Sequence, residues 1–154
     1  MRNDGKIRWG ILGPGGIAKD FFAGSLQSKT GVVAAIGARD PAKPGLAEAF
    51  PGARILDGYA ALISDPDIDA IYIATPHPSH AEWAIKAAEA GKHVLCEKPM
   101  SLTAAEAAAM FHAARRAGTF MGEAFMYRLH PMTAKLVELV KSGIIGDEIG
   151  RAHV

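Results

Sequence analysis

The chain has 154 residues, a length that suits one domain with a sizeable core. Hydrophobic residues make up 49% of it and the formal net charge is +1, so we expect a soluble globular protein and find no electrostatic support for nucleic-acid binding. The single cysteine, Cys96, excludes an internal disulfide and any site built from several cysteines, and no metal site is predicted. No export signal opens the chain and no apolar run reaches membrane-spanning length, so we expect a cytoplasmic protein with no membrane partner.

Short apolar runs alternate with segments of helical periodicity along the chain. The runs predict strands at residues 7–13, 32–38, 54–56, 69–75, 93–96 and 119–126. The periodic segments predict helices at residues 17–26, 41–50, 59–64, 79–90 and 104–117, and from 131 onward. This alternation predicts an α/β protein with a doubly wound Rossmann fold, in which helices cover both faces of a parallel sheet.

Capping residues mark the ends of two of these helices. Ser79 and Glu82 have the spacing of a capping box, so Ser79 is interpreted as a cap that contributes about 1 kcal/mol, and Gly91 is placed to end that helix. Thr103 and Glu106 have the same spacing before the alanine-rich helix.

The stretch GILGPGGIA places a glycine-rich turn directly between the first strand and the first helix. Gly13, Gly15 and Ala18 form a G-x-G-x-x-A arrangement, which is typical of dinucleotide-binding folds. Gly13 allows the tight turn, Gly15 lets a pyrophosphate approach the backbone, and Gly16 and Ile17 follow where the helix N-terminus offers free N–H groups. The alternative is a glycine turn with a purely structural role.

The end of the second strand indicates which nucleotide is bound. NAD-binding folds commonly place an acid there for the ribose 2′-hydroxyl, but here the position is Ala38 and Arg39 follows it. A guanidinium suits a 2′-phosphate, and Lys43 adds a second positive charge, so we predict NADP, with NAD as the alternative cofactor. Asp40 either pairs with Arg39 or binds the ribose itself, and the alternative to a cofactor contact is that Arg39 is a solvated surface residue.

The loop TPHPSH follows the fourth predicted strand. Because parallel sheets bind ligands at the carboxyl ends of their strands, Thr75 and Pro76 are predicted to line the site. His77 lies in the loop and is a candidate ligand contact. His80 falls in the first turn of the next helix and is assigned a structural role.

The stretch VLCEKPM places a charged pair at the tip of the fifth predicted strand. Lys98 can donate to a nicotinamide ribose and a substrate hydroxyl, and can relay the proton that leaves when hydride moves. Glu97 either orients Lys98 or binds ribose, and Pro99 fixes the turn, with a cis peptide bond as one way to do so. The alternative is an ordinary exposed ion pair between Glu97 and Lys98.

GILGPGGIA, ATPHPSHAEWAIKAAEAGKHVLCEKP and EAFMYRLHP together resemble the glucose–fructose oxidoreductase, inositol dehydrogenase and rhizopine-catabolism (Gfo/Idh/MocA) family, over residues 7–154. The E-K-P triplet is its most specific signature, and EAFMYRLHP with Arg39 looks most like its NADP-dependent dihydrodiol and aldose dehydrogenases. The resemblance implies that Lys98 is catalytic. It matches cofactor-contacting positions at Gly13, Gly15, Ile17, Arg39, Thr75, His77, Glu97 and Lys98, although the family often has Asn in place of His77. Arg128 and His130 match positions near the cofactor and substrate edge, or belong to a helix-entry turn.

The resemblance also implies an oxidoreductase that transfers hydride between NADP and a sugar, polyol or cyclic dihydrodiol. Family members carry a second α/β domain that completes the substrate site and commonly forms the dimer interface, so a homo-oligomer is expected of the full-length protein. We therefore expect residues 1–145 to form the dinucleotide-binding domain and residues 146–154 a stub of the second domain, in a fragment with little turnover. A strand at residues 149–154 that pairs with a neighbour is a further expectation. A non-catalytic NADP-sensing module and a ligand-free scaffold are the alternatives.

Overall fold

The computed structural model describes residues 5–146, which divide into two units, one ending at Ala124 and one beginning at Phe125. In the first unit, six strands form a single parallel sheet in the order β3-β2-β1-β4-β5-β6. The strands are β1 (Ile7–Leu12), β2 (Gly31–Ala38), β3 (Arg54–Asp57), β4 (Ala70–Ile73), β5 (His93–Cys96) and β6 (Met121–Glu123). The helices are α1 (Gly16–Ser25), α2 (Leu46–Ala49), α3 (Tyr59–Ser64), α4 (His80–Glu89) and α5 (Ala104–Ala117). This is the predicted doubly wound Rossmann fold.

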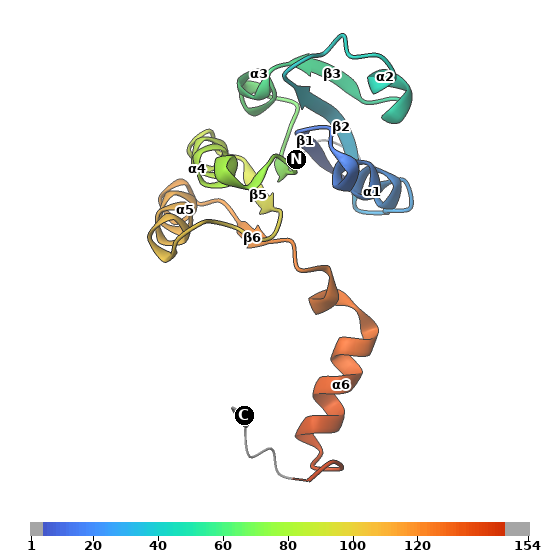
Figure 1. Cartoon of the computed structure of the whole chain (residues 1–154), viewed down its shortest axis with the longest axis vertical. Helices are drawn as coiled ribbons and strands as arrows, with labels where there is room; N and C mark the ends of the chain where they lie inside the picture. The colour runs from blue at the N-terminus through green and yellow to red at the C-terminus, as the bar shows by residue number, and fades with distance from the viewer. Residues whose placement is uncertain (1–4, 147–154) are drawn as a thin grey trace. The chain divides into compact units, whose positions relative to one another are not determined.

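Helices cover both faces of the sheet (Figure 1). One core cluster joins one face of the sheet to α3, α4 and α5, through buried residues such as Leu62, Ala87 and Met110. A second cluster joins the other face to α1 and α2, through Phe22 and Leu46. Because both faces of the sheet are covered, all four residues of the central strand β4 are buried.

The strands end in register along one edge of the sheet. Leu12 pairs with Ile73, and Ile73 pairs with Cys96, so the carboxyl ends of β1, β4 and β5 lie side by side. Gly13 follows β1, Ala74 follows β4 and Glu97 follows β5, so the segments predicted to carry the chemistry meet at this edge.

The capping prediction at Ser79 is wrong. A 3₁₀ turn, η1 (His77–Ser79), precedes α4, and no side chain caps the helix at Ser79. The turn directs the Ser79 hydroxyl back toward the β4 loop, where it donates to Thr75 Oγ1 at 2.9 Å. The capping box at Thr103 is confirmed, since Thr103 Oγ1 accepts from the Glu106 N–H at 3.2 Å.

Two elements are less than half as long as predicted. The helix expected at 41–50 is only α2, because Pro44 and the left-handed Gly45 (φ +76°) precede its first turn. The strand expected at 119–126 ends at Glu123, where β6 stops pairing with β5. Over the described range, residues 5–146, no helix is both long and apolar enough to cross a membrane.

The second unit contains the 3₁₀ helix η2 (Met126–Leu129) and the helix α6 (Pro131–Lys141). His130 caps α6, with its Nδ1 accepting from the Met132 N–H at 3.1 Å. Thr133 Oγ1 donates to the Tyr127 carbonyl at 2.5 Å, which ties the helix to η2. The expected strand at 149–154 and all but the first residue of the expected stub at 146–154 lie outside the described residues.

Candidate functional site

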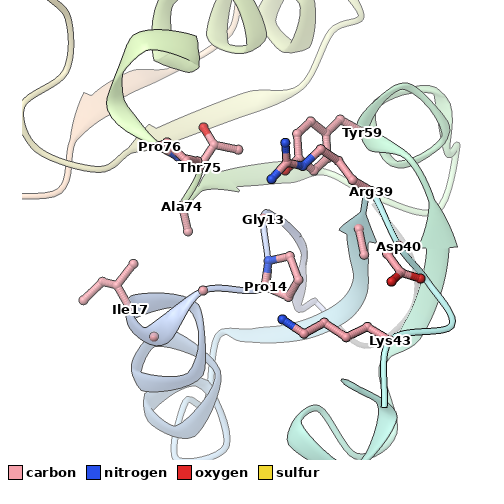
Figure 2. Close-up of a pocket in the computed structure, with 13 residues that line it drawn as sticks. Gly13, Pro14, Ile17, Arg39, Asp40, Lys43, Tyr59, Ala74, Thr75 and Pro76 are labelled. Carbon is pink, nitrogen blue, oxygen red and sulfur yellow. The ribbon is translucent and has the colours of Figure 1, made fainter. Parts of the chain in front are cut away.

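A pocket of about 690 Å³ lies at the carboxyl ends of β1, β2 and β4 (Figure 2). Most of the residues predicted to bind cofactor line it: Gly13, Gly15, Gly16, Ile17, Arg39, Lys43, Thr75 and Pro76. The predicted glycine turn, basic loop and β4 tip are therefore parts of one concave site.

The turn between β1 and α1 has a conformation that requires glycine. Gly13 has φ +96°, and a Cβ there would lie 3.1 Å from Thr75 Cγ2 and 3.2 Å from the Ala74 carbonyl oxygen. A Cβ added at Gly16, at the start of α1, would have no other atom within 4 Å. No side-chain cap is present at Gly15, so the first N–H groups of α1 are left for a ligand or water at the positive end of the helix dipole.

Two basic side chains form the opposite wall. Arg39 and Lys43 are exposed residues of the loop after β2, and in Figure 2 their charged groups extend into the pocket. Asp40 also lines the pocket, but the ion pairs found across residues 5–146 do not join it to Arg39. Asp40 therefore does not neutralise the charge of the Arg39 guanidinium, and the pocket wall formed by Arg39 and Lys43 can attract an anionic group.

The tip of β4 is tied down by hydrogen bonds. Thr75 is 7% exposed; its hydroxyl accepts from Ser79 Oγ, and its carbonyl oxygen lies 2.8 Å from His80 Nε2. The structural role predicted for His80 is confirmed, because this ring is 2% exposed and its Nδ1 lies 3.0 Å from the Pro99 carbonyl oxygen. His77 packs its ring 5.3 Å from that of His80, and its buried Nε2 has no hydrogen-bond partner within the described chain.

At the tip of β5, Glu97 points inward and Lys98 is exposed. Glu97 is 7% exposed and accepts a hydrogen bond from the Tyr72 hydroxyl through Oε1 and from the Lys98 N–H at 3.1 Å through Oε2. Burial, reinforced by Glu97, raises the pKa of Tyr72 above its ordinary value, so the phenol stays protonated as a donor. The alternative of an exposed Glu97–Lys98 ion pair is therefore wrong. The Lys98–Pro99 peptide is cis.

The family of the chain follows from comparison with known proteins. A family model for Gfo/Idh/MocA proteins, described as "Oxidoreductase family, NAD-binding Rossmann fold", matches residues 7–125. The chain belongs to this oxidoreductase family.

Relatives in the Gfo/Idh/MocA family include sugar and diol dehydrogenases. The chain is 42% identical, over 88% of its length, to D-xylose 1-dehydrogenase (NADP(+)) 2 of Haloferax volcanii, and 40% identical, over 96% of its length, to the mouse trans-1,2-dihydrobenzene-1,2-diol dehydrogenase. The crystal structure of KijD10, a 3-ketoreductase from Actinomadura kijaniata in complex with NADP, matches 92% of the chain with a TM-score of 0.85 and 34% identity. The chain spans 42%, 45% and 46% of these three proteins, respectively.

Four of the predicted site residues do not line the pocket of this Gfo/Idh/MocA chain. His77 lies beside it because it follows the lining residue Pro76 in the chain. Glu97 and Lys98 lie beside it because the Glu97 N–H donates to the Ile73 carbonyl at 3.0 Å, which keeps the β5 tip next to the β4 tip. Arg128 lies in η2 of the second unit, and its contact with cofactor stays a prediction.

Sequence reasoning missed two tyrosines. Tyr59, at the start of α3, also lines the pocket and packs edge-on against Trp83 with ring centroids 5.2 Å apart. Tyr72, in β4, donates a hydrogen bond to Glu97 and stacks on Phe21 of α1 with ring centroids 4.0 Å apart. A phenol within an aliphatic strand was a usable signal for Tyr72, since a buried hydroxyl requires a partner.

Proposed function

We propose that this chain binds NADP(H) in the pocket beside Gly13 and is the cofactor-binding part of an oxidoreductase. One observation carries the proposal: the glycine turn, the uncapped N-terminus of α1 and the side chains of Arg39 and Lys43 line the same pocket. Helix N-termini and cationic side chains are groups that bind phosphates, and NADP carries phosphates at two separate positions.

The two walls of the pocket suit the two phosphate positions of NADP. The pyrophosphate is assigned to the N–H groups of Gly15, Gly16 and Ile17, with Gly13 held back against β4 to leave room. The 2′-phosphate is assigned to Arg39 and Lys43, since Ala38 offers no carboxylate to a ribose 2′-hydroxyl. The NADP named for the Haloferax enzyme and for KijD10 supports this assignment.

Lys98 is proposed as the catalytic residue of the whole protein. NADP supplies the hydride acceptor or donor, and Lys98, exposed beside the β4 tip, would hold and move the proton of the reacting hydroxyl. His77, Glu97 and Arg128 are proposed to contribute to the nicotinamide side. Glu97 can do so while it remains bonded to Tyr72 and the Lys98 N–H.

The substrate class we propose is a sugar, polyol or cyclic dihydrodiol, by likeness to the xylose and dihydrobenzenediol dehydrogenases. We place the dinucleotide-binding domain at residues 1–145. Tested alone, the 154-residue polypeptide is expected to bind NADP but to turn over little, since it spans less than half of each of these relatives and an open site does not exclude water or orient a substrate. A non-catalytic NADP-sensing module makes the same binding prediction. It differs in showing no Lys98-dependent hydride transfer in the full-length protein.

Cofactor titration of Arg39→Asp tests the proposal. The wild-type chain is expected to prefer NADP over NAD, and the substitution to weaken NADP binding by about 100-fold or more, since it replaces a charge-assisted phosphate contact with repulsion. Arg115→Asp, which makes the same charge change at an exposed position on α5, is the matched control and is expected to bind NADP like the wild type. Unchanged NADP affinity in Arg39→Asp would refute the assignment.

A further inference from the structure

His80 connects the two functional loops through a buried ring. Its Nε2 lies 2.8 Å from the carbonyl oxygen of Thr75, which lines the pocket, and its Nδ1 lies 3.0 Å from the carbonyl oxygen of Pro99, which follows Lys98. We propose that His80 is a positioning residue that transmits occupation of the pocket to Lys98. This inference rests on the proposed function above.

The Thr75 end of the connection touches the glycine turn. Gly13 packs so closely on Thr75 that an added Cβ would lie 3.1 Å from Thr75 Cγ2. Ser79 Oγ donates its one proton toward Thr75 Oγ1 at 2.9 Å and the Pro76 carbonyl oxygen at 3.0 Å, so it ties Thr75 to the turn that begins α4. A phosphate group that settles on the glycine turn therefore displaces Thr75 as a unit, together with the carbonyl that faces His80.

The Pro99 end is the part of the Lys98 turn that His80 can move. On one side of Lys98, Glu97 is held by the Tyr72 hydroxyl. On the other side, the Met100 N–H donates to Glu123 Oε1 at 2.8 Å. Lys98 is exposed between these two anchors, so a shift of the Pro99 carbonyl changes the direction of the lysine rather than the position of the whole loop.

The contacts of His80 can be observed directly. A carbonyl oxygen only accepts, so each contact is a hydrogen bond only when the facing ring nitrogen carries a proton. The ¹⁵N chemical shifts of the two ring nitrogens therefore report which carbonyl is bonded. The neighbouring ring is that of His77, 5.3 Å away and inclined at 77°, and it is a separate signal in the same spectrum.

The test uses a ligand that fills the pocket without a nicotinamide, so that it cannot touch Lys98 directly. The probe is 2′-phosphoadenosine 5′-diphosphate, titrated into the 154-residue chain while NMR follows the backbone signal of Lys98. In the wild type this signal is expected to shift with the binding curve. In His80→Gln, which keeps one buried donor, the shift at saturation is expected to fall at least about twofold, as expected when a link in a contiguous network is cut. His112→Gln, the same substitution at an exposed position on α5, is expected to keep the full shift.

The outcomes separate this inference from the proposed function. A full Lys98 shift in saturated His80→Gln overturns the positioning role and leaves the cofactor assignment standing. Failure of the probe to bind the wild type overturns the proposed function, and the inference with it. If His80→Gln does not fold, the ¹⁵N chemical shifts of the His80 ring in the wild type provide the test. Shifts of Nδ1, on the Pro99 side, that follow the same binding curve as Lys98 support the connection, and an unchanged Nδ1 signal while Lys98 shifts overturns it.

Discussion

The Tyr72 hydroxyl donates to the carboxylate of Glu97, and this buried bond links the centre of β4 to the tip of β5. Tyr72 also stacks on Phe21, so α1, whose N-terminus lines the pocket, is packed against the same tyrosine. The residue before Lys98 is thus fixed by the core of the fold. This arrangement explains how a buried strand can end in a charged pair: one member is held inside and the other is left exposed.

Tyr72→Phe is expected to lower the free energy of unfolding by about 1–3 kcal/mol, because it keeps the ring stack with Phe21 and leaves a buried carboxylate oxygen without its donor. Chemical denaturation measures the change. Tyr59→Phe, which removes a phenol from the half-exposed pocket wall, is the control and should change stability by less. Equal stability of Tyr72→Phe and the wild type would show that the bond contributes nothing.

Two glycines of the same turn are expected to respond in opposite ways to alanine. Gly13→Ala should destabilise the fold by more than about 1 kcal/mol and abolish NADP binding, since its φ of +96° strains any residue with a Cβ and that Cβ would crowd the backbone of Ala74. Gly16→Ala should keep or raise the melting temperature, because its surroundings are open and alanine favours the helix.

NADP titration then completes the comparison. Gly16→Ala is expected to lose affinity despite its intact fold, because the methyl group would lie where the pyrophosphate approaches α1. A stable Gly16→Ala protein with wild-type affinity would move the pyrophosphate away from this turn.

Cys96 is expected to make the fold less stable at alkaline pH. Burial, with Glu123 and Glu97 nearby, raises the pKa of its thiol from about 9 to about 12. Between these values the unfolded chain loses the proton and the folded chain keeps it, so the unfolded state binds fewer protons and the free energy of unfolding falls as pH rises, by up to about 1.4 kcal/mol per pH unit.

Comparison of Cys96→Ala with the wild type isolates this contribution, because Cys96 is the single cysteine. Unfolding free energies measured from pH 8 to pH 10.5 are expected to fall more steeply in the wild type than in Cys96→Ala. Parallel curves would contradict the raised pKa. At pH 8 the folded thiol should also react slowly with a disulfide reagent, since the raised pKa keeps it protonated.

Thr103 and Ser79 both have the sequence spacing of a capping box, but only Thr103 caps its helix, so substitutions at the two positions should have different effects. Thr103→Ala is expected to cost about 1 kcal/mol, as loss of an N-cap does. Ser79→Ala should instead weaken NADP binding through Thr75, because the Ser79 hydroxyl bonds that residue and does not cap α4. A loss of helix stability in Ser79→Ala with unchanged binding would restore the capping interpretation.

The sheet could be predicted from short apolar runs, because a strand such as β4 that is buried on both faces is apolar along its length. The helices between the strands could be predicted because their apolar residues recur at helical spacing. The pocket wall at Arg39 and Lys43 was also predictable, since chain order alone brings the ends of β1 and β2 together. The bond between Tyr72 and Glu97 and the place of Tyr59 were not predictable in this way. Both depend on the distance between elements that are far apart in the chain. The hydrogen bond from the Ser79 hydroxyl to Thr75 was not predictable either, because it depends on the 3₁₀ turn between them.

A crystal structure of the chain with NADP bound tests the central claim most directly. We expect the 2′-phosphate between Arg39 and Lys43, the pyrophosphate at the N–H groups of Gly15 to Ile17, and the nicotinamide at the β4 and β5 tips with the Lys98 amine directed toward it. Phosphates bound away from the Gly13 turn, or a Lys98 side chain that points away from the nicotinamide, would contradict the account.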